Sequence, residues 1–223
     1  MHTFDTSAAV SAVIDLPAGR IQLIAADRTD TTVEVRPADP ARNRDVQAAE
    51  QVTATCADDV LHVQAAPAKN RVLGHSGSVE VTIQLPAGSR VQAKSASTEF
   101  RGVGRLGDVT LASAQAAVKI DEASGVRLEL SAGDVTLGRL TGPAHISTQK
   151  GDITLTEAVR GTLTLRTEAG AISVGAARGT SATLDAGTGY GRVHNTLRNS
   201  AGADAQLHIH ATTGYGDISA HSL

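Results

Sequence analysis

One short unit is written three times between Val126 and Gly179, and this repeat restricts the fold more than any other feature. The copies span residues 128–142, 146–161 and 165–179 and carry SAGDVTL, TQKGDITL and TEAGAISV. A fixed period of 17 to 19 residues is typical of architectures in which each copy forms one layer of a stack. We therefore predict a coil of similar rungs rather than a globular core.

Each copy has the same internal spacing, with one apolar residue seven positions before a second. The pairs are Ala93 and Phe100, Leu111 and Val118, Leu128 and Val135, Ile146 and Ile153, and Leu165 and Ile172. In the last two copies the interval reads as nine, from Leu184 to Val193 and from Ile209 to Ile218. We interpret this as two extra residues in the final turns.

The stretch LELSAGDVTL shows how one rung would fold. Alternation places Leu128 and Val135 inward and Glu129 and Thr136 outward. One rung cannot offset its own ordering entropy, but stacked neighbours bury both of its faces. Strands that recur in one direction pair in parallel, and such crossovers are right-handed. The expected fold is an all-β, right-handed parallel β-solenoid, also called a β-helix.

The solenoid should have a decorated N-terminal half within a single domain of residues 1–223. We expect longer strands and a loop over residues 1–90, and regular rungs of 17–25 residues over 91–223. Strands are predicted at 13–16, 21–25, 33–35 and 79–85, a short helix at 44–50, a hairpin across Ala57-Asp58-Asp59, and a loop at 66–78. The sequence LPAG occurs at both 16–19 and 85–88, which suggests two equivalent strand–turn–strand units.

Composition excludes several function classes. The net charge of −3 comes from 20 basic and 23 acidic residues that are well mixed, so no face for nucleic acid is expected. The single cysteine, Cys56, allows no intrachain disulfide. The first residues lack the pattern of a signal peptide, and no apolar run reaches the ~18 residues of a membrane helix. We expect a cytoplasmic protein without membrane contact.

Two glycine motifs have structural explanations. Residues 102–107 match G-x-G-x-x-G, but a strand pattern follows where a dinucleotide site needs a helix, so solenoid turns are expected. The Gly-Asp turns offer one carboxylate each, at Asp108, Asp134, Asp152 and Asp217, which is too few oxygens for calcium. Aspartate as a turn residue is the simpler interpretation. No metal and no cofactor is expected.

The histidines near the C-terminus leave two alternatives. His208 and His210 flank Ile209 and share one side of a strand, and His194 lies one rung earlier. Three imidazoles that met there would bind zinc. The other interpretation is that they are exposed polar positions, since His194 belongs to the second strand of its rung.

Both tyrosines occupy one repeated motif. Tyr190 lies in TGYG at 188–191, and Tyr215 lies in TGYG at 213–216, 25 positions later. Two stacked rings could close the end of the solenoid. Alternatively, they could form an aromatic patch that grips a ligand or partner. We take Tyr190, Tyr215, His194, His208 and His210 as the candidate binding residues, and no catalytic residue is identified.

Several stretches resemble a known family. The rung pattern, DRTDTTVEVRPADPARNRDVQAAE at 27–50, VEVTIQLPAGSRV at 79–91 and TGYGDIS at 213–219 are similar to the bacterial putative-adhesin family, a β-strand-repeat domain of unknown function. The resemblance covers nearly the whole chain. It implies a right-handed β-solenoid and an adhesin-like role, and it supplies no catalytic residues.

These observations favour a non-enzymatic, adhesin-like binding or scaffolding protein with a protein or small-molecule partner. The alternative is an enzyme, such as a cyclase or isomerase of secondary metabolism, with a pocket near Tyr190 and Tyr215. A third class is a homo-oligomer that assembles through exposed end strands.

Overall fold

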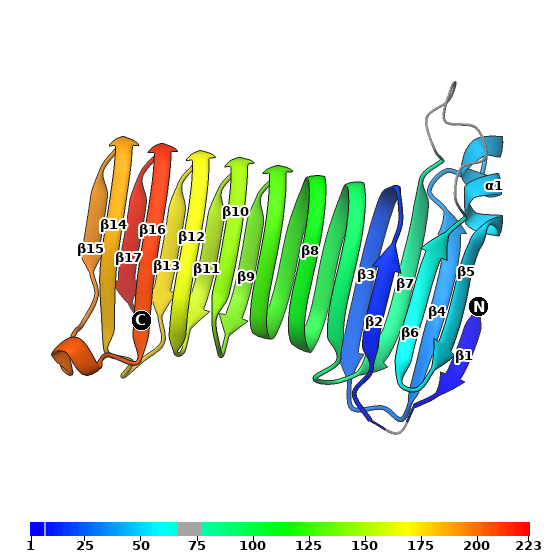
Figure 1. Ribbon diagram of the computed structural model, residues 1–223, viewed down its shortest axis with the longest axis horizontal. Helices are drawn as coiled ribbons and strands as arrows, with labels where there is room; N and C mark the ends of the chain where they lie inside the picture. The colour runs from blue at the N-terminus through cyan, green and yellow to red at the C-terminus, as the bar shows by residue number, and fades with distance from the viewer. Residues whose placement is uncertain (7, 67–76) are drawn as a thin grey trace.

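The computed structural model describes residues 1–6, 8–66 and 77–223. The chain winds into a flattened rod of stacked rungs, and Figure 1 shows this rod from the side. Each rung contributes one strand to a first face and one to a second face, and equivalent strands of most neighbouring rungs pair in parallel. The prediction of a β-solenoid is confirmed.

The regular part of the rod begins with an unusually long element. Strand β8 (Arg90–Ala132) stays extended through 43 residues and winds around successive rungs without a break. It is followed by β9 (Val135–Leu140), β10 (Ala144–Lys150), β11 (Ile153–Ala158), β12 (Gly161–Ala169) and β13 (Ile172–Ala176). Strands β10 and β12 lie on the first face, and β9, β11 and β13 lie on the second face.

The last two rungs are stacked in the reverse of their chain order. They comprise β14 (Ala182–Tyr190), β15 (Val193–Thr196), η1 (Gly202–Asp204), β16 (Leu207–Tyr215) and β17 (Ile218–Ser222). Strand β16 pairs with β12 on one side and with β14 on the other, and β17 likewise lies between β13 and β15. The rung of β14 and β15 is therefore outermost, as Figure 1 shows.

This arrangement corrects the expected nine-residue interval of the last two copies. Leu165 pairs with Ala211, and Ala211 pairs with Ala186. Since Ile218 and Val193 both continue the Ile172 column, the true interval is again seven. The pattern was misread because small alanines occupy the first column there, while the larger Leu184 and Ile209 belong to the neighbouring Leu163 column.

The same shift separates Arg166 from Asp185, which a nine-residue interval would place side by side. Arg166 lies beside Thr212, and Asp185 lies beside His210. The Asp185 carboxylate is 3.3 Å from Nδ1 of His210. A slip of two residues keeps every side chain on its own face, so alternation alone could not reveal it.

The N-terminal half contains the predicted elements and one strand that was not foreseen. Its elements are β1 (His2–Asp5), β2 (Ser11–Asp15), β3 (Ala18–Ala26), β4 (Asp30–Pro37), α1 (Asn43–Glu50), β5 (Val52–Ala57), β6 (Val60–Ala65) and β7 (Val79–Pro86). The expected strands, helix and hairpin are present, and β1 is the addition. Most of the predicted loop at 66–78 lies outside the described residues. None of the helices seen in the described ranges is long and apolar enough to span a membrane.

At the N-terminal end of the rod, too, the order of the rungs differs from the order of the chain. The rung of β2 and β3 lies between the rung of β6 and β7 and the start of β8. Two antiparallel strands then cover the end of the rod, because β4 pairs with β7 and β5 pairs with β6. Strand β1 pairs with β4, and α1 lies against β4 and β7.

The two LPAG sequences are not equivalent. The first joins β2 to β3 within one rung. In the second, Leu85 and Pro86 pair with Ala25 and Ala26, so it lies at the opposite corner of the coil. Four residues with Pro and Gly form a turn at either corner, because turn chemistry is local and carries no information about register.

Val135 and Thr136 test which side chains face inward. Val135 is 1% exposed between Val118 and Ile153, while Thr136 points out of the second face. We expect Val135→Asp to lower the free energy of unfolding by about 3 kcal/mol or more, because it buries an unpaired charge. Thr136→Asp is the matched control and should shift the thermal midpoint only slightly. Equal effects in circular dichroism melts would contradict the assignment of the faces.

Candidate binding surface

Tyr190 and Tyr215 form a stacked pair at one corner of the outermost rungs. The residues are direct partners in the β14–β16 ladder. Their ring centroids are 4.9 Å apart and the ring planes differ by 4°. The side chains remain 71% and 62% exposed. The rings therefore stack at the end of the solenoid, as one of the two interpretations expected, and they face solvent.

The TGYG motif explains why the rings point outward. The inward threonines hold the corner, since Thr188 Oγ1 donates to the Gly216 carbonyl and Thr213 Oγ1 donates to the Gly170 carbonyl, both at 2.9 Å. Gly216 has a φ of +146°, and a Cβ there would lie 2.0 Å from the Gly170 oxygen. Because only glycine allows this close approach, the larger tyrosine occupies the outward position beside it.

Charged groups flank the tyrosine corner. Arg192 follows Tyr190 by two positions, and its backbone N–H donates to Oδ1 of Asp217 at 2.8 Å. The Arg192 side chain is 90% exposed and lies 3.6 Å from the other Asp217 oxygen. The guanidinium is therefore free to turn toward a partner.

The three histidines do not converge. His208 and His210 lie on β16, where Nδ1 of His208 is 2.9 Å from Thr183 Oγ1 and Nδ1 of His210 is near Asp185. His194 lies on β15, beside Ser219 on the second face. The zinc alternative is wrong in its geometry, because two of the side chains are on one face and the third is on the other. The described residues contain no cluster of three His, Cys, Asp or Glu side chains that could hold a metal ion.

The Gly-Asp turns form a ladder of hydrogen bonds between rungs. Oδ1 of Asp134 accepts the Asp152 N–H at 2.9 Å, and Oδ1 of Asp152 accepts the Ala171 N–H at 2.8 Å. Asp217 repeats the contact with Arg192. These three carboxylates thus each satisfy a backbone donor of the next rung, which is a structural role for them. Asp108 is not part of this ladder, and its Oδ2 lies 3.9 Å from Nε of Arg90.

The G-x-G-x-x-G stretch at 102–107 is part of the solenoid wall. It lies inside β8, which continues as a strand to Ala132, so no helix follows it. Gly104 has a φ of +79°, and a Cβ there would lie 2.1 Å from the Ala25 oxygen. The glycine therefore allows close stacking of two rungs and does not build a phosphate site.

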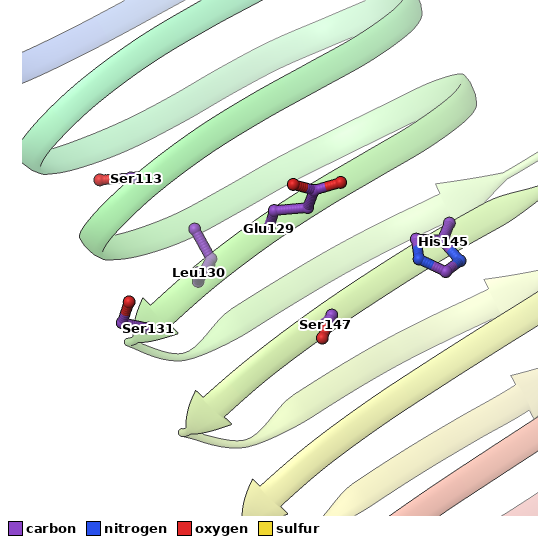
Figure 2. A pocket seen from close by; sticks show the side chains of 6 residues that line it. All are labelled: Ser113, Glu129, Leu130, Ser131, His145 and Ser147. Carbon is purple, nitrogen blue, oxygen red and sulfur yellow. The ribbon is translucent and has the colours of Figure 1, made fainter.

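A shallow hollow lies on the first face, away from the tyrosines. It has a volume of about 350 Å³ and is lined by Ser113, Glu129, Leu130, Ser131, His145 and Ser147. Figure 2 shows that Glu129 and His145 come from neighbouring strands, with Ser147 below them and Ser113 and Ser131 to the left. Three of the six lining residues are serines, whose short side chains leave space beside Glu129 and His145. The sequence offered no motif that marks it.

Among the described residues of the N-terminal half, three groups have displaced pKa values. Hydrogen bonding to Arg28 lowers the pKa of Asp30. A hydrogen bond to Glu99 raises the pKa of Arg20, and burial raises the pKa of the Cys56 thiol. These groups belong to β4, β3 and β5, and they support the decorated end of the rod rather than the tyrosine corner.

The outermost rung leaves its interior partly open. All four residues of β15 are exposed, and Val193 is 45% exposed although its column is buried elsewhere. Leu184 and Ala186 of β14 are only partly buried. Asn195 continues the inward column of Val174 and Ala220. This polar residue at an inward position was the sequence signal that could have identified the last layer.

The fold and this end surface define a β-solenoid with one covered and one open end. The Toastrack DUF4097 family matches residues 7–221, and the chain belongs to this family. A search of curated proteins found no match.

Two solved structures resemble the whole chain. A putative adhesin from Bacteroides fragilis has a TM-score of 0.51 and 13% identity, and the match covers 98% of this chain and 95% of the other. A putative cell adhesion protein from Clostridium sporogenes has a TM-score of 0.40 and 10% identity, with 100% and 98% coverage. At these identities, the first likeness supports the fold alone.

The ladder of aspartate hydrogen bonds is interrupted at Ala171, which occupies the position that Asp152 and Asp217 hold in the neighbouring turns. Asp152→Ala should lower the free energy of unfolding by roughly 1 kcal/mol, because the Ala171 N–H loses its acceptor. Ala171→Asp should raise it by about 0.5–1 kcal/mol, because the new carboxylate would accept from the Asp217 N–H of the next rung. Urea unfolding would measure both. A midpoint that rises on adding calcium would contradict the structural role of these turns.

Proposed function

We propose that this protein is a non-enzymatic, adhesin-like binding or scaffolding protein that holds a protein partner through the Tyr190–Tyr215 pair. The observation that carries this proposal is the exposure of two stacked rings on a rigid ladder. Tyrosine is enriched at protein interfaces and among the residues that dominate binding energy. Rings that are already stacked lose little side-chain freedom when a partner binds.

The distribution of exposed apolar side chains supports this surface. The large apolar residues exposed in the described ranges are Met1, Tyr190, Val193, Tyr215 and Leu223. Three of them, Tyr190, Val193 and Tyr215, gather on the last two rungs. Apolar residues clustered within a polar surface are typical of interaction sites.

The adhesin-like part of the proposal draws on the resemblance to proteins of that description. The Bacteroides fragilis structure shares the fold and is called a putative adhesin. A rod with a rigid aromatic corner suits such a role, because it can project a contact surface away from its decorated end. The cytoplasm is retained as the proposed compartment, and cell fractionation would test it.

The enzyme alternative receives less support from the geometry. Its pocket was expected near Tyr190 and Tyr215, whereas these rings stand 71% and 62% exposed on an open corner. Water-exposed rings do not enclose a substrate as most small-molecule sites do.

Photo-crosslinking followed by reconstitution would test the proposed function. A benzophenone side chain placed at Tyr190 should crosslink one discrete protein other than a second copy of this chain, in cells that make this protein, while the same group at Thr136 should not. With that partner purified, Tyr190→Ala and Tyr215→Ala should each weaken binding roughly tenfold or more in calorimetry, which corresponds to about 1.4 kcal/mol.

Thr154→Ala provides the matched control, since this residue is on the second face, away from the tyrosine corner. It should leave the affinity unchanged. Affinities that are the same for wild type and both tyrosine variants would overturn the proposed contact. Turnover of a small molecule that is lost on changing either tyrosine would favour the enzyme.

A further inference from the structure

The two ends of the rod are built differently. At the N-terminal end, β4 and β5 lie antiparallel on β7 and β6 and cover the last rung. At the other end, β14 pairs only with β16, and β15 pairs only with β17, within the described chain. Figure 1 shows β14 and β15 as the last strands of the rod, with η1 projecting beyond them at the lower corner, where the Arg198 carbonyl accepts the Ala182 N–H.

The free edge of β14 lacks the devices that usually prevent strand pairing. It is nine residues long, carries Asp185 as its single charged residue, and contains no lysine or proline. Natural sheets protect free edges with charges, proline, bulges or short strands. A long edge without them is suited to pairing with another strand.

The interior of this end also needs cover. Val193 is 45% exposed, and Leu184 and Ala186 are partly buried, whereas the same columns are buried in the inner rungs. A layer placed on this end would therefore bury apolar side chains and satisfy backbone groups together. A single peptide strand would cover one face only, and a complete rung is needed to cover both.

We propose that this end binds a second copy of the chain, so that two rods join end to end around a twofold axis. The axis passes through the corner between Tyr190 and Gly191. Strand β14 of one copy then runs antiparallel along β15 of the other. This inference does not depend on the partner proposed above, which contacts the edges of the tyrosine rings rather than their outer faces.

The residues of the end rung complement one another under this symmetry. Inward side chains meet inward side chains, since Thr188 lies opposite Val193 and Leu184 opposite Leu197 of the second copy. Asp185 falls opposite Thr196 of the second copy and not opposite its own counterpart, so like charges are kept apart. Along the part of the end rung that η1 leaves free, the side-chain order thus suits pairing with a second copy.

The tyrosine corner adds a complementary charge contact. Near the axis, the exposed Arg192 guanidinium of each copy reaches the outer face of Tyr190 in the other. A guanidinium over a tyrosine face is a favourable cation–π contact. Because a twofold interface uses the end rung of both copies, the contact closes and the assembly stops at two copies.

Sedimentation equilibrium over a concentration series tests this proposal with the full chain. The wild type should weigh as a dimer that dissociates on dilution. Val193→Lys should raise the dissociation constant at least roughly tenfold, because the charge would be buried in the dimer yet solvated in the monomer. Thr136→Lys is the matched control, since its side chain points out of the second face on an inner rung, and it should dimerise like the wild type.

A crosslink at the axis provides a second readout. In a Cys56→Ser background, Tyr190→Cys should form a disulfide-linked dimer on mild oxidation, whereas Thr136→Cys should remain monomeric on a denaturing gel. Thermal melts would verify that each variant is folded. A wild type that is monomeric at every concentration would overturn the proposal, as would a dimer unaffected by Val193→Lys or assembly beyond two copies. The affinity for the partner proposed above is measured in a separate experiment, so either proposal can be contradicted while the other stands.

Discussion

Close approach of backbones between rungs is the constraint on which the rest of the structure depends. Parallel pairing brings equivalent residues of neighbouring rungs into columns, and the aliphatic side chains within each column stack on their own kind. At the corners the approach is closer than a side chain allows, and a Cβ on Gly151 would lie 2.1 Å from the Gly133 oxygen. The glycines therefore fix the corner, and the corner fixes the register of both strands that leave it.

The corners also show how one geometric requirement produces two kinds of surface. Where the corner sequence is Gly-Asp, the carboxylate bonds to the next rung and the surface is polar. At 213–217 a tyrosine precedes the same Gly-Asp turn, so Tyr215 is carried outward while Asp217 still bonds to the next rung. The aromatic pair is thus a variation on the same turn, placed on the two rungs where stacking ends.

Much of the fold could be predicted from the sequence, because each rung repeats a local pattern. The seven-residue spacing identified the inward positions from Ala93 to Ile172. The expected short helix is also present, over Asn43–Glu50. The order of the rungs could not be predicted, since β16 matches the pairing pattern of β12 and β14 equally well. Leu184 was also assigned to the wrong column. As a large apolar residue it was taken as the equivalent of Leu165, whereas the equivalent residue is the small Ala186.

The candidate site was predictable only in part. The repeated TGYG motif located Tyr190 and Tyr215 at one corner, and the structure adds that the rings stack and remain exposed. The separation of His194 from His208 and His210 depends on which strand of a rung each occupies, and this becomes clear only from the pairing of whole strands.

The inserted position of β16 and β17 has a consequence for how the protein is made. Residues 182–196 leave the ribosome before residues 207–222, yet they are held to the rod only through the later segment. Synthesis therefore cannot extend the stack one layer at a time to its tip. The final strands, β16 and β17, must insert between β12 and β13 on one side and β14 and β15 on the other. A prematurely terminated product would lack the rung that joins β14 and β15 to the rest of the rod.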